Sequence, residues 1–194
     1  MSLRSTAGLV VITVVCLLGP LVARAYGTAE ALPRFWTGAL LLVVAPLPLA
    51  ASIGLGVTVA FASATAAWLS ICAAGLGAFT IAVVDATAFG GSPSVAVIAI
   101  AGIVSILGWT PPAWLALLLG LATGAVAATA SNAGMQHWDA ALGLTAMVIV
   151  ISGWTAKSLR YARTFPQLED VVPVARRVIG AWGTAIALLL ARSL

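Results

Sequence analysis

The sequence predicts an all-α integral membrane protein, a polytopic bundle of about six transmembrane helices. Three observations lead to this prediction. Of the 194 residues, 62% are hydrophobic and only 7% are charged, whereas a soluble domain carries about 25% charged residues. The apolar residues form successive runs separated by short turns rich in Gly, Pro and polar residues. More than half of the positive charge lies in one segment, 157–177. So few charges cannot cover a globular surface in water, whereas lipid can cover the surface that they leave.

The first 25 residues have the order of a secretory signal peptide. Arg4 supplies the positive start, residues 8–18 form an apolar core, and small residues flank a cleavage position at 23–25. The alternative is an uncleaved first span. In either case, residues 26–194 are expected to form a single transmembrane domain.

Six apolar runs are the candidate spans, and they cover residues 47–63, 64–85, 94–108, 113–130, 139–156 and 178–191. Several are shorter than the ~20 residues that cross a hydrocarbon core. They would cross upright, thin the bilayer or be protected by other proteins. Before the first run, Pro46 and Pro48 interrupt the helix expected at 31–48, because each proline removes an amide donor. This stretch is either a re-entrant half-helix or part of one kinked span.

The basic segment 157–177 predicts the orientation, because basic residues beside spans stay on the cytoplasmic side. Counting spans back from this segment places 109–112 and 63–65 inside as well. The mature N-terminus and the C-terminus then lie outside a bacterial-type inner membrane. The same placement explains the sequence pI of 9.8 without nucleic acid as a partner. Tryptophans near the predicted helix ends suit an interfacial belt: Trp109, Trp114, Trp138, Trp154 and Trp182.

The candidate metal ligands are few, and they cluster on the outer side. Met135, His137 and Asp139 occupy one turn, and Asp85 ends another predicted span. The alternative is a polar turn in which Asp139 caps a helix. The polar residues within the runs are mainly Ser and Thr, whose hydroxyls can bond to a carbonyl one turn back. Because no catalytic triad or phosphate-binding Gly loop is present, the sequence predicts neither an enzyme nor a particular cofactor.

Gly120 and Gly124 have the four-residue spacing that lets two transmembrane helices approach closely. This face is expected to pack within the subunit or to bind a second copy or a partner membrane subunit.

Two stretches carry a resemblance to a known family. The first runs from Arg34-Phe35-Trp36-Thr37-Gly38 to the proline break, and the second is the Arg176-Arg177 pair that leads into the final helix. With the signal peptide and the order of spans, they resemble the hydrogenase/urease accessory membrane proteins of the HupE/UreJ type. The resemblance implies a polytopic helical fold and nickel or cobalt permeation. The family's His-Pro pair is Ala45-Pro46 in this chain, so no metal ligand is carried over.

Two functions are consistent with these patterns. The first is a HupE/UreJ-like permease that handles a metal or a small solute without the usual His and Asp ligands. The second is a non-catalytic small subunit of a larger membrane complex, which the missing ligands, short spans and small-residue faces favour.

Overall fold

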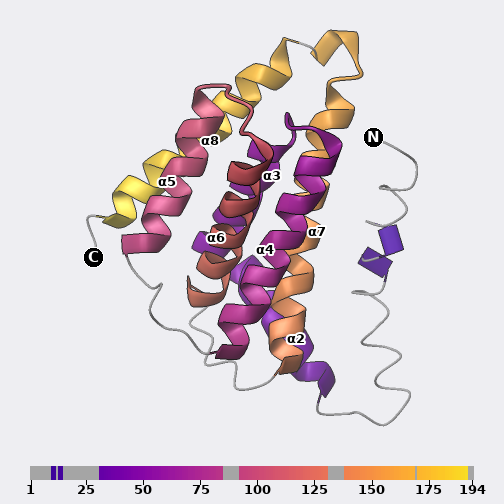
Figure 1. Cartoon of the computed structure of the whole chain (residues 1–194), viewed down its shortest axis with the longest axis vertical. Helices are drawn as coiled ribbons and strands as arrows, with labels where there is room; N and C mark the ends of the chain where they lie inside the picture. Colours follow the sequence, from indigo (N-terminus) through magenta and orange to yellow (C-terminus); the bar gives the residue numbers. More distant parts are fainter. Residues whose placement is uncertain are drawn as a thin grey trace.

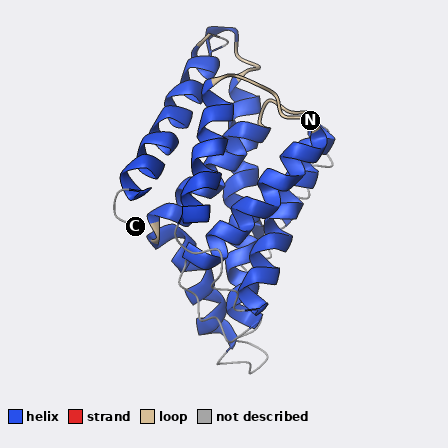
Figure 2. Ribbon diagram, turned by 60° about the vertical axis from the view of Figure 1, so that its left-hand side comes forward, coloured by secondary structure: helices blue, strands red, loops and turns tan. Residues whose placement is uncertain are grey.

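The computed structural model describes residues 10, 11, 13, 14, 31–84, 92–130, 138–168 and 170–191. Within these ranges the regular structure is entirely helical, which confirms the all-α prediction (Figures 1 and 2). The helices are α2 (Ala31–Val44), α3 (Pro46–Val59), α4 (Ala64–Val84), α5 (Ser92–Ile106), α6 (Ala113–Ala130), α7 (Trp138–Ala162), the 3₁₀ helix η2 (Pro166–Leu168) and α8 (Val171–Ala191). The predicted signal peptide, 1–25, lies outside the described residues apart from four positions.

The prediction of six spans is confirmed in part. Each of the six apolar runs contains a helix. Of the helices in the described ranges, however, only α4, α7 and α8 are long and apolar enough to cross a membrane alone. The boundaries also differ at the basic segment, because α7 continues to Ala162 and α8 already begins at Val171. Charged residues there are part of the helices, so the helices extend beyond the apolar runs 139–156 and 178–191.

From α3 onward, successive helices alternate in direction. Arg176 near the start of α8 bonds to Gly108 just after α5, whereas Gly180 packs on Gly102, so these two helices are antiparallel. Ser70 of α4 bonds to Ala116 near the start of α6, and these two helices run parallel. The three described connections, 60–63, 107–112 and 163–170, therefore gather at one end, the upper end in Figure 1. We call this the basic end of the bundle.

Helices α2 and α3 follow one path along α7. Gly143, near the start of α7, packs against Phe35 of α2, and Gly56 of α3 packs further along α7 against Ser152. The break between them is Ala45, whose backbone is extended (φ −84°, ψ 119°) ahead of the proline that starts α3. This arrangement is that of one kinked helix alongside α7, and it does not turn back as a re-entrant half-helix would.

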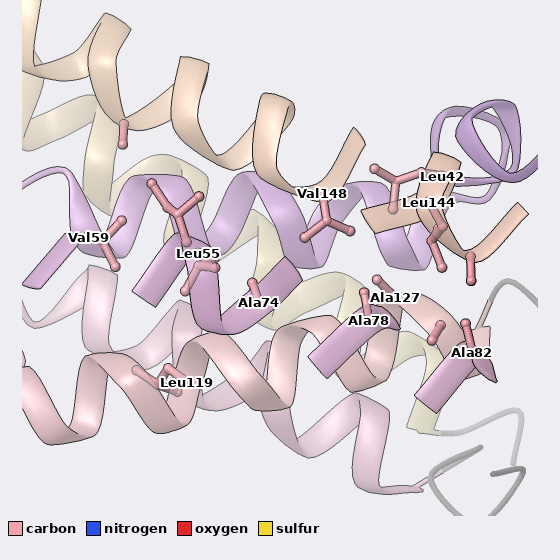
Figure 3. Packing of buried hydrophobic residues seen from close by; sticks show 14 of the residues in the cluster. Leu42, Leu55, Val59, Ala74, Ala78, Ala82, Leu119, Ala127, Leu144 and Val148 are labelled. Carbon is pink, nitrogen blue, oxygen red and sulfur yellow. The ribbon is translucent and has the colours of Figure 1, made fainter. Parts of the chain in front are cut away.

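The main core lies where α3, α4, α6 and α7 meet. It consists of small and branched apolar residues, and Figure 3 shows Leu55, Ala74, Ala78 and Val148 among them. Hydroxyls inside the bundle bond in two ways. Ser52 bonds one turn back to the carbonyl of Pro48 at 2.9 Å, as expected, whereas Ser152 bonds across helices to the carbonyl of Ser52 at 3.0 Å.

Candidate functional site

The predicted outer metal site is described at only one of its four positions. Asp85, Met135 and His137 lie outside the described residues. Asp139 lies in the first turn of α7, is 8% exposed, and its buried Oδ1 has no hydrogen-bond partner. The described residues contain no group of three His, Cys, Asp or Glu side chains that could hold a metal ion.

The basic end concentrates charge much more strongly. Five of the six Lys and Arg side chains in the described ranges lie there: Lys157, Arg160, Arg163, Arg176 and Arg177. Among the described residues, no carboxylate forms an ion pair with Lys157, Arg160, Arg163 or Arg176. The first four of these cations form two groups. Arg160 and Arg176 bond to backbone carbonyls, whereas Lys157 and Arg163 contact aromatic rings.

Arg160 closes the end of α3. Its Nε donates to the carbonyl of Ala60 at 2.8 Å, and its Nη2 donates to those of Val59 at 3.0 Å and Ala62 at 2.7 Å. The last carbonyls of a helix have no partner within the helix. Because the residues at the end of α3 are buried, these carbonyls need a protein donor, and the guanidinium supplies several at once.

Arg176 does the same for α5. Its Nη1 donates to the carbonyl of Gly108 at 2.9 Å, and its Nη2 donates to that of Trp109 at 2.6 Å. Gly108 has a φ of 68°, the left-handed conformation that commonly follows a helix end. Arg176 is only 4% exposed, and its Nε is buried without a hydrogen-bond partner. Arg176 is therefore an internal part of the fold, and the half-buried Arg160 is fixed to it through Nε and Nη2.

Phe61 links the two groups of cations. The guanidinium of Arg176 lies 4.3 Å from the centroid of its ring, and that of Arg163 lies 5.1 Å from it. Arginine over an aromatic face is attracted by the ring quadrupole. Phe61, in the turn between α3 and α4, thus connects the buried Arg176 to the exposed Arg163.

A cavity of about 390 Å³ opens at this end. The small residues of the α3–α4 turn form part of its wall, and the other lining residues are Phe61, Lys157, Arg160, Tyr161, Arg163 and Thr164. We call this cavity the basic pocket. Its cationic lining is suited to an anion and offers no ligand set for a transition metal, which prefers imidazole, thiolate or carboxylate.

A second, apolar pocket of about 170 Å³ lies between α3, α5 and α8. A methyl group added at Gly54 or at Gly183 would meet nothing within 4 Å, so both glycines border open space. Trp182 also lines this pocket, and its side chain is 70% exposed. It lies eleven residues after Val171, the first residue of α8, or roughly 16 Å along the helix. It also lies five residues after Arg177, or about 7.5 Å of helix rise, so its expected place near an interface stays a prediction.

Sequence reasoning identified the basic segment but not the pocket. Lys157, Arg160 and Arg163 are three residues apart, which places them on the same side of a helix. That spacing was the available signal for a shared site. The partners of Arg160 and Arg176 are backbone carbonyls 67 or more positions away, and no sequence pattern indicates them.

Comparison with protein-family models, with curated proteins and with solved structures finds no match to this chain.

Proposed function

We propose that the chain is a multi-pass inner-membrane protein that serves as a non-catalytic subunit of a larger membrane assembly. In this proposal all six predicted spans cross the bilayer, with α2 and α3 acting as one kinked crossing. The basic end faces the cytoplasm, in agreement with the positive-inside bias. The outer surface of α8 is the contact for a helix of the partner.

The exposure of Trp182 supports this proposal most directly. Trp182 is 70% exposed on α8 and borders the apolar pocket. Exposed aromatic residues beside an apolar pocket are frequent anchors of protein–protein contacts. The most apolar window of α8 is only 22% buried, against 50% in α4 and 44% in α7. Gly120 and Gly124 pack on α4 of the same chain, so we place the partner on α8 and not on that face.

The test is extraction of the native protein in mild detergent, followed by mass spectrometry of the proteins that co-elute. We expect partner subunits in fixed ratio. Trp182→Ala should release them, whereas Trp114→Ala, which removes another tryptophan that is 65% exposed, should retain them. A lone wild-type chain, or equal loss in both variants, would contradict the proposal.

Cysteine labelling from either side of the membrane tests the proposed orientation separately. With Cys16 and Cys72 replaced by serine, Thr164→Cys at the basic end should react with a membrane-impermeant maleimide only from the cytoplasmic side. Trp138→Cys, at the opposite end of α7, should react only from the other side. Labelling with the sides exchanged would reverse the proposed topology.

A permease function of the HupE/UreJ type is the second candidate. One observation favours it: the break at Ala45 lies in the first stretch that carries the family resemblance. Proteoliposomes containing the purified chain should then show saturable uptake of nickel, cobalt or a small neutral solute. Absence of flux for all three would remove this candidate.

A further inference from the structure

The polar side chains around the basic pocket differ in how many hydrogen bonds they already make to the protein. Thr164 lines the pocket too, but its hydroxyl already donates to the carbonyl of Tyr161 at 2.7 Å. Lys157 contacts the ring of Trp154, with its Nζ 4.6 Å from the centroid, and the guanidinium of Arg163 contacts the ring of Phe61. Ring contacts leave the N–H groups of both side chains available as hydrogen-bond donors.

Arg160 contributes to the pocket differently. Its Nε and Nη2 are bonded to the carbonyls at the end of α3. The described structure gives its Nη1 no acceptor. The carbonyl bonds hold the guanidinium in one position, so the remaining N–H groups are held in place before any ligand arrives. Such preorganisation lowers the entropic cost of binding.

The charges of the pocket are unbalanced. Three cationic side chains line one cavity of about 390 Å³, and no carboxylate forms an ion pair with them among the described residues. Their mutual repulsion falls when an anion binds between them. The available groups are donors, which matches a ligand that presents several acceptor oxygens. Arginine and lysine recognise phosphate in this way.

We propose that the basic pocket binds a phosphate-bearing anion through Lys157, Arg163 and the Nη1 of Arg160. Tyr161, which lines the pocket and is 64% exposed, adds a hydroxyl donor. The phosphate belongs either to an anionic lipid headgroup of the adjacent leaflet or to a free phosphate compound. Basic pockets between transmembrane helices on the cytoplasmic side are suited to anionic headgroups. The inference goes beyond the proposed function, because it assigns a ligand to a site that a partner subunit does not need.

The experiment uses the full chain purified in detergent, with two probes. Native mass spectrometry counts bound dioleoylphosphatidylglycerol against dioleoylphosphatidylcholine, and a thermal-shift titration measures inorganic phosphate against chloride at constant ionic strength. Preferential phosphatidylglycerol binding that excess phosphate does not displace identifies the lipid headgroup as the source. Phosphate-dependent stabilisation with displacement of the lipid identifies a free phosphate compound. Both results support the site.

Matched variants separate the pocket from the general positive charge of this end. Arg163→Gln and Lys157→Gln each remove one charge from the pocket, and Arg177→Gln removes one from a side chain outside it. The two pocket variants should bind the preferred probe about tenfold more weakly, because charge-assisted hydrogen bonds are lost. Arg177→Gln should stay within about twofold of the wild type, because its charge acts only at a distance. All three side chains lack hydrogen bonds to the described protein, so the variants should lower the melting temperature without ligand by only a few degrees, through the lost ring contacts of Lys157 and Arg163.

Two outcomes would overturn the proposal. One is the absence of both preferences, for phosphatidylglycerol over phosphatidylcholine and for phosphate over chloride. The other is an equal loss of affinity in Arg177→Gln and in the pocket variants, which would mean that bulk charge attracts the anion. The measurement uses the isolated chain, so a failure to co-purify partner subunits does not affect it.

Discussion

The α4–α6 interface and the apolar pocket bounded by α3, α5 and α8 both contain glycine, but its role differs between them. A methyl group at Gly124 would overlap the carbonyl oxygen of Ala74, and one at Gly120 would overlap that of Ser70. At Gly54 and Gly183 the same methyl group would meet nothing within 4 Å. Glycine therefore brings two backbones together in the first region and leaves space beside the helix in the second. Substitutions that add carbon atoms should have opposite effects in the two regions.

The largest effect is expected at the close interface. Gly124→Val places a branched side chain against the backbone of α4, and neither helix can move without disturbing the main core. Overpacking of this kind should destabilise the protein by about 3 kcal/mol, which corresponds to a fall of roughly 10 °C in melting temperature. Thermal unfolding of the purified protein in detergent measures this. A variant as stable as the wild type would mean that α4 and α6 are not in backbone contact.

Arg176→Met should have the second largest effect, and it tests how α8 is held beside the apolar pocket. The contacts that join α8 to α5 include the approach of Gly180 to Gly102 and the bonds from Arg176 to the carbonyls of Gly108 and Trp109. Removing the guanidinium leaves these carbonyls unpaired, which should cost about 2 kcal/mol. Arg177→Met changes an exposed side chain and should stay within about 0.5 kcal/mol of the wild type. Equal melting temperatures for the two variants would show that the bonds from Arg176 do not help to hold α8.

The difference between the two regions also shows the limit of sequence reasoning. Composition and apolar runs predicted the helices, and the four-residue spacing of Gly120 and Gly124 predicted a close helix contact. Gly54 and Gly56 were equivalent in sequence, yet Gly56 packs against α7 and Gly54 borders the apolar pocket. Which side of α3 meets a neighbour depends on how the whole bundle is assembled. When a helix is apolar on all sides, the spacing of its apolar residues does not indicate which side meets a neighbouring helix.

The same limit applies to the candidate site. The sequence predicted that the segment 157–177 is basic and lies at one end of the bundle. It placed Arg160 and Arg176 in that segment without assigning them partners, whereas both bond to carbonyls at the ends of other helices. The positions of those carbonyls depend on where α3 and α5 stop, and these ends become neighbours of α7 and α8 only in the folded chain.

The smallest effect is expected at the apolar pocket, where the test is whether a substitution raises or lowers the stability of the protein. Gly54→Ala adds a methyl group to open space and removes a helix-interior glycine, which costs about 0.8–1.0 kcal/mol relative to alanine. The variant should therefore be slightly more stable, by about 0.5 kcal/mol, chiefly because alanine reduces the conformational entropy of the unfolded chain. Gly77→Ala in α4 is the matched control, because its methyl group would contact the carbonyl of Leu121, and it should be destabilised.

If Gly54→Ala is stabilising in detergent but weakens the protein in native membranes, another molecule occupies the pocket there. If it destabilises the protein in both environments, α3 and α8 lie closer together than this structure places them, and the contrast between the two regions would not hold.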